Sequence, residues 1–93
     1  MGIINSFKAK GHQHGGVLAF SPEIALSIVS RLEEAGVDVL GIDGFKIGQD
    51  SIQPFMEHSI NFEYSEENWS RARKFLQEKK DLGLVFEIVA RGE

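Results

Sequence analysis

Residues 36–44, which read Gly-Val-Asp-Val-Leu-Gly-Ile-Asp-Gly, constrain the fold of this chain more than any other stretch. The β-branched and apolar residues of this run fall on both faces of a strand, as is typical of a strand that is central or covered on both sides. The run ends at Asp43 and Gly44, a pair that favours a turn because both residues tolerate positive φ. We therefore expect a binding surface where this strand ends, without catalytic machinery.

Two continuations of this strand are compatible with the sequence. In the first, Asp43 and Gly44 form a two-residue hairpin turn. In the second, the strand continues through a bulge at Gly44 to Ile47 and turns within residues 48–51. We slightly prefer the second, because its turn signal is longer. In both, Asp43 lies at a break in regular pairing, where its side chain can point outward.

One helix is predicted before this strand and another after it. Ser21 and Pro22 are typical of a helix start, as the N-cap and the first helical residue. Apolar residues then recur at three- and four-residue spacing until Gly36, the expected C′ residue. A second helix is expected after Ser65, with Trp69 on its inner face and therefore in the core.

Further strands are predicted where apolar residues alternate or cluster. These segments are residues 16–20, 60–64 and 84–90. Residues 52–59 are expected to be irregular, because Pro54 interrupts them.

This order of elements predicts a small single α+β domain that spans residues 1–93. We expect a mixed four- to five-stranded sheet with two helices packed on one face. A split β-α-β arrangement of the ferredoxin type is the expected topology. Residues 1–16 are expected to form a flexible N-terminal segment, because glycines and polar residues dominate them.

Composition excludes several classes of protein. At 42% hydrophobic and 26% charged residues, the chain of 93 residues is typical of a globular domain. No apolar run approaches the ~20 residues that a membrane helix needs, and the N-terminus lacks a secretory signal. The absence of cysteine excludes a disulfide framework and a thiol nucleophile. We therefore expect a cytoplasmic protein with no membrane partner.

Charge is distributed unevenly along the chain. Residues 38–67 carry seven acidic residues and one lysine, a net charge of −6, whereas residues 71–80 carry a net charge of +4. An acidic middle opposes direct binding of nucleic acid and favours a basic partner. The alternative is that these charges only solvate exposed surface.

No motif in the sequence supports catalysis. The glycines of residues 41–48 suggest a phosphate loop, but the Lys-Ser/Thr pair of such loops is missing. His12 and His14 could ligate a metal, but no further candidate ligands lie near them in the sequence. We therefore expect no enzyme activity, no catalytic residues, no metal site and no cofactor.

Several residues of the chain occur in a pattern that belongs to a known family. The pattern consists of Ser21-Pro22, Ala25, Gly36 and the Leu-Gly-Ile-Asp-Gly of residues 40–44, with a weaker continuation in Glu67-Asn68, Ala72 and Gly83. It resembles the immunity proteins of colicin E-type tRNA ribonucleases. The resemblance covers about half of the chain, and its most specific part is the pentapeptide. Residues 1–20 extend beyond the family pattern, and residues 45–47 depart from it.

This resemblance implies a bacterial immunity protein, an antitoxin that inhibits a cognate nuclease toxin by blocking its RNA-binding cleft with an acidic surface. Acidic side chains would then stand in for phosphates, and an aromatic ring for a base. The expected partner-binding residues are Asp43, Phe45, Lys46, Asp50, Glu63 and Glu66. A generic regulatory module that binds another protein and a small enzyme are the alternatives.

Overall fold

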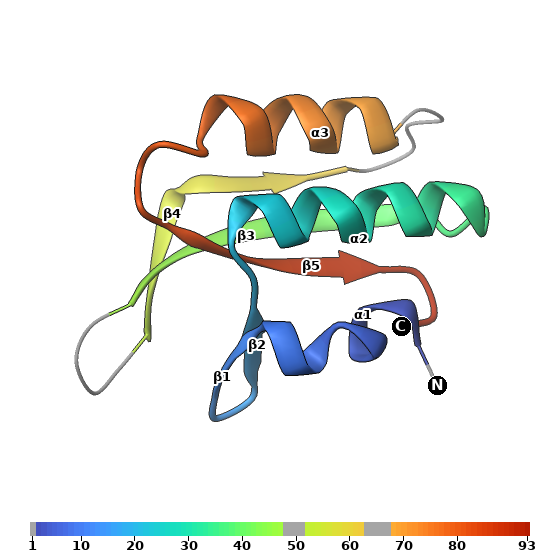
Figure 1. Cartoon of the computed structure of the whole chain (residues 1–93). Helices are drawn as coiled ribbons and strands as arrows, with labels where there is room; N and C mark the ends of the chain where they lie inside the picture. Colours follow the sequence, from blue (N-terminus) through green and yellow to red (C-terminus); the bar gives the residue numbers. More distant parts are fainter. Residues whose placement is uncertain (1, 48–51, 63–67) are drawn as a thin grey trace.

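Two helices pack on one face of an antiparallel sheet in the computed structural model, which describes residues 2–47, 52–62 and 68–93 (Figure 1). The helices are α2 (Pro22–Glu34) and α3 (Asn68–Glu78). The predicted α+β class and the packing of both helices on one face of the sheet are therefore confirmed. No helix of the described residues is long and apolar enough to cross a lipid bilayer.

The main sheet has three strands in the order β4-β3-β5, and both strand pairs are antiparallel. Its strands are β3 (Val39–Ile47), β4 (Ile52–Asn61) and β5 (Val85–Ala90). The prediction of a mixed four- to five-stranded sheet is wrong, since the main sheet is smaller and antiparallel. The split β-α-β topology is also wrong. It would place β4 beside the strand that precedes α2, whereas β3 occupies the centre and pairs with β5.

The strand that precedes α2 belongs to a separate two-stranded sheet. In this sheet, β1 (His12–His14) pairs with β2 (Val17–Ala19) around a two-residue turn in which Gly15 has φ of 57°. Before the hairpin lie a short helix, α1 (Ile3–Ser6), and a 3₁₀ turn, η1 (Lys8–Lys10). An isolated β-bridge joins the small sheet to the main one, and in it Phe20 and Phe86 exchange backbone hydrogen bonds of 2.9 and 2.7 Å.

The central strand β3 runs without a turn from Val39 to Ile47, and its register shifts between Asp43 and Gly44. The continuation of the strand to Ile47 is therefore confirmed, but the expected bulge at Gly44 is wrong, because the extra residues, 56–58, belong to β4 and β3 stays in register with β5 there. A hairpin turn at Asp43 and Gly44 is wrong, because both residues pair with β4 and β5. The turn expected at residues 48–51 lies outside the described residues.

β4 contains the segment that was predicted to be irregular. The register pairs Pro54 with Phe45, and β4 is the edge strand of the sheet. An edge strand tolerates proline because its outer N–H groups need no partner in the sheet. The prediction failed because it took Pro54 as a break and did not consider an edge position.

The first helix follows its sequence signals closely. Pro22 occupies the first turn after Ser21, and Gly36 adopts φ of 70° after the last turn, as predicted. The Ser21 side chain makes no capping hydrogen bond among the described residues. The inner face of α2 is fully buried in a core shared with Phe20, Phe86 and the inner face of α3.

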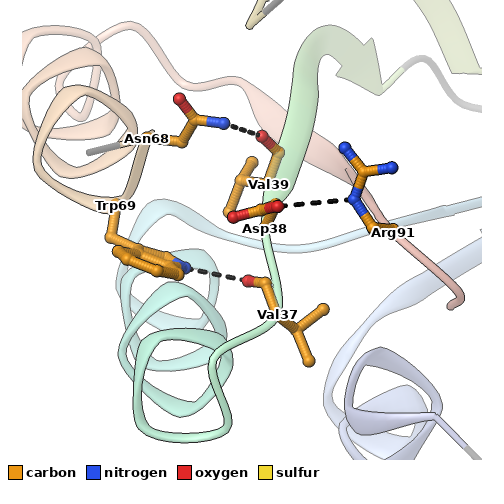
Figure 2. A network of polar contacts seen from close by, with 6 residues as sticks. All are labelled: Val37, Asp38, Val39, Asn68, Trp69 and Arg91. Atoms are coloured by element: carbon orange, nitrogen blue, oxygen red, sulfur yellow. Dashed lines mark hydrogen bonds and ion pairs between the residues drawn. The ribbon is translucent and has the colours of Figure 1, made fainter. Parts of the chain in front are cut away.

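The start of α3 is tied to the start of β3 by side-chain hydrogen bonds (Figure 2). The amide Nδ2 of Asn68 donates to the carbonyl oxygen of Val39 at 2.8 Å. The indole Nε1 of Trp69 donates to the carbonyl oxygen of Val37 at 2.9 Å. These bonds satisfy backbone carbonyls of the segment that leads into β3, and they fix the strand beneath the helix.

Trp69 therefore has two structural tasks. Its ring is partly buried and packs against the core, as its place on the inner helix face predicts. Its N–H also finds a partner, as the N–H of a buried tryptophan usually does. Ser65, after which this helix is expected to begin, lies outside the described residues.

Candidate functional site

The face of the main sheet opposite the helices carries a row of polar side chains. Asp43 on β3 pairs with Ser59 on β4 and with Glu87 on β5, so these three residues lie side by side across the sheet. Side chains alternate along a strand, and the neighbours Ile42, Phe86 and Ile88 are buried in the helix-side core. Asp43, Ser59 and Glu87 therefore project from the other face.

Asp43 and Glu87 form a pair of like charges at directly opposed positions. Both side chains are half-buried. Burial, and then the negative charge of Asp43, raise the pKa of Glu87 above its ordinary value of 4.5. The ion pairs found among the described residues, Arg73 with Glu33 and Arg91 with Asp38, involve neither member. The site thus has a negative charge that no cation of the described residues neutralises through an ion pair.

A second row borders this pair on the same face. It consists of Asn61, Gly41 and Val89, in which Gly41 occupies the central strand. Val89 is an exposed apolar side chain, at 43%. A Cβ atom on Gly41 would lie 3.1 Å from the Asn61 Oδ1 atom, so the absence of a side chain lets Asn61 lie close to the central strand. We call Asp43, Glu87, Ser59, Asn61 and Val89 the open sheet face.

The other end of this face is covered by the small sheet. Phe45 is 7% exposed and packs with Ala19 and Val85 in a second apolar cluster. This cluster lies beside the Asp43–Glu87 row, two residues along each strand. It supports the acidic pair from one side and contributes to its partial burial.

The predicted partner-binding residues do not all lie in the same environment in the structure. Asp43 lies on the open sheet face, and Lys46 is exposed near the end of β3. Phe45 lies in the second apolar cluster, where little of its surface can reach a partner. The remaining three, Asp50, Glu63 and Glu66, lie outside the described residues.

Glu87 and Val89 were not among the predicted site residues. Both lie on β5, which is an edge strand of the main sheet. Glu87 is the one charged residue of β5. In an otherwise apolar strand, a single acid indicates the face that is not fully covered, and this signal was present in the sequence.

The open sheet face contains no recognisable metal centre. No group of three or more His, Cys, Asp or Glu side chains that could hold a metal ion occurs within the part of the chain that the structure describes. His12 and His14 lie on β1 of the small sheet, whereas Asp43 and Glu87 belong to the main sheet. The chemistry that remains is electrostatic: two carboxylates beside an apolar side chain can accept hydrogen bonds from a cationic group.

A scan against protein-family models matches no family, and a search of curated proteins finds no match.

Proposed function

We propose that this chain is an immunity protein, which inhibits a cognate nuclease toxin by covering its basic RNA-binding cleft with the open sheet face. The observation that carries the proposal is the Asp43–Glu87 pair. Like charges at opposed positions of a sheet destabilise the fold. An arginine or lysine of a partner would relieve this repulsion on binding, so the pair is better suited to a complex than to the free protein.

The chemistry of the expected partner fits this surface. A protein that binds RNA neutralises phosphates with lysine and arginine side chains, so its cleft is basic. Carboxylates satisfy the same donors, especially when they accept paired bonds from arginine. Val89 adds an exposed apolar contact beside the charges. Acidic groups with a neighbouring apolar residue are a suitable combination for an inhibitor of such a cleft.

The family resemblance also supports β3 as part of the proposed contact surface. Its most specific part, residues 40–44, lies in β3 and contains Asp43. A standard interface takes about 800 Å² and about 20–30 residues from each partner, which is more than the five residues of the open sheet face. We propose that the other expected contacts, Lys46, Asp50, Glu63 and Glu66, add to this surface; Lys46 is exposed on β3, and the other three lie outside the described residues.

The test is protection from a toxin in living cells. The nuclease domain encoded beside the gene of this chain is expressed from an inducible promoter, with and without the chain. We expect the chain to restore growth and to bind the purified domain. The double variant with Asp43→Asn and Glu87→Gln should lose protection, whereas Glu34→Gln, an exposed acid on α2, should keep it.

Two outcomes would count against the proposal. If the chain neither protects cells nor binds the neighbouring nuclease, the immunity function is wrong. If the neighbouring gene encodes a protein without nuclease activity that binds the open sheet face, the alternative of a generic protein-binding module is correct.

A further inference from the structure

The two sheets separate immediately after the bridge that joins them. Phe20 and Phe86 form an antiparallel bridge, and its continuation would pair Leu18 with Ile88 and then Gly16 with Ala90. No backbone hydrogen bond joins either of these pairs among the described residues. Instead, all four residues line a groove of about 300 Å³ between β2 and β5.

Backbone groups of both strands face this groove. The N–H and C=O of Phe86 point away from β3, because both are bonded to Phe20. Residues two apart in a strand point to the same edge, so the N–H and C=O of Ile88 point into the groove. By the same alternation, the backbone groups of Leu18 point away from β1 and towards the groove. Such an edge is a template for pairing with another strand.

The side chains around the groove indicate the chemistry of an occupant. Ile4, Leu18 and Val89 supply apolar surface. The charged residues of the described lining are both acidic, Glu87 and Glu93, and Glu87 faces Asp43 across the sheet. The Glu93 carboxylate also accepts a hydrogen bond of 2.8 Å from the backbone N–H of Ile4, which holds the first helix beside the groove.

We infer that this groove binds an extended segment of a basic partner, which adds as a strand to the edge of β5. Main-chain hydrogen bonds to Ile88 would provide affinity, and alternate side chains would provide specificity. A lysine or arginine of the segment would reach Glu87 on the open sheet face, and apolar side chains on the opposite face of the segment would contact Leu18. A second copy of the chain fits less well, because antiparallel pairing of two β5 strands about Ile88 would place Val89 of the second copy, and not a cation, opposite Glu87.

This inference deepens the proposed function and rests on it in taking the partner to be basic. The probe is a blocked seven-residue peptide in which lysine alternates with valine. In the free protein, the amide of Ile88 should exchange hydrogen faster than those of Glu87 and Val89, which face β3. Saturating peptide should slow exchange at Ile88 by about tenfold or more, because the amide becomes hydrogen-bonded.

Modified peptides distinguish backbone pairing from charge attraction as the source of binding. Two versions of the peptide are N-methylated, one at its odd-numbered residues and the other at its even-numbered residues. At least one of them should lose binding, because its backbone cannot donate hydrogen bonds to the strand edge. A version with glutamate in place of lysine should bind at least tenfold more weakly, since the groove is acidic. If both methylated versions bind like the parent peptide, strand addition is wrong while the proposed function stands. If the glutamate version binds equally well, the basic partner is wrong.

A variant of the protein gives an independent test. Gly16 lines the groove, and a Cβ atom on it would meet nothing within 4 Å, so Gly16→Phe adds a ring at this position without a clash at its Cβ. We expect this variant to melt like the parent and to lose peptide binding. Gln77→Phe, at an exposed position of α3, is the matched control and should bind normally. A folded Gly16→Phe variant that binds the peptide and protects Ile88 like the parent would overturn the inference.

Discussion

Asp43 and Glu87 occupy directly opposed positions on β3 and β5, and the pKa of Glu87 is raised by burial and by the charge of Asp43. The folded chain therefore retains the Glu87 proton at pH values where the unfolded chain has released it. Stability falls with pH wherever the native state binds more protons than the unfolded state. The contribution of Glu87 to the free energy of unfolding thus decreases as pH rises from 4.5 through the raised pKa.

Glu87→Gln should remove this pH dependence and stabilise the protein at pH 7. We expect a gain of about 0.2–1 kcal/mol, towards the lower end because solvent screens a half-exposed pair. Urea unfolding at pH 4 and pH 7 measures the effect. Glu34→Gln is the control and should change neither value. A Glu87→Gln variant less stable than the parent at pH 7 would show that the pair is not repulsive.

Trp69→Phe should destabilise the protein while leaving its binding intact. Phenylalanine keeps most of the ring packing but leaves the carbonyl oxygen of Val37 without its donor. The expected loss is about 1–2 kcal/mol for the missing hydrogen bond, and Trp69→Ala should cost about 3 kcal/mol or more because packing is lost too. Urea unfolding checks both values. A variant as stable as the parent that no longer binds the nuclease domain would place Trp69 in the interface.

Phe45→Ala should mainly lower the stability of the protein and should affect binding less directly. The ring is 7% exposed and fills the cluster between the small sheet and the main sheet. Loss of a buried aromatic side chain costs about 3–5 kcal/mol. Thermal unfolding measures the change, and Val17→Ala at the edge of the same cluster should cost less. If Phe45→Ala keeps its stability but loses nuclease binding, the ring contacts the partner as the sequence analysis predicted.

The sequence predicted the elements of this fold better than their arrangement. Local signals are strong at both ends of α2, where Pro22 and Gly36 each have a conformational reason for their position. The continuation of β3 past Gly44 was also predicted, from the longer turn signal at residues 48–51, although the irregularity lies on β4 and not at Gly44. Strand order depends on contacts between distant residues, such as Phe20 with Phe86, and no local pattern encodes such a pairing.

The candidate site was predicted only in part, because it too depends on contacts between distant residues. Asp43 could be found from the chain because the Asp-Gly pair marks a break in regular strand pairing. Its neighbour Glu87 comes from a strand 44 residues later, and only the register of β3 with β5 brings the two acids together. Pairing of β5 with β3 is therefore the information that the sequence analysis lacked.

Association with the nuclease domain should depend on the open sheet face through electrostatics. Opposite charges steer the encounter of two proteins, and salt screens this attraction over about 10 Å at 0.1 M ionic strength. The double variant with Asp43→Asn and Glu87→Gln should therefore associate about tenfold more slowly at low salt and show a flatter salt dependence. Its thermal stability should equal or slightly exceed that of the parent, because a repulsive pair is removed. Stopped-flow binding at two salt concentrations measures the rates, with Glu34→Gln as the control on the helix side. If Glu34→Gln slows association while the double variant does not, the partner binds the helices and not the open sheet face.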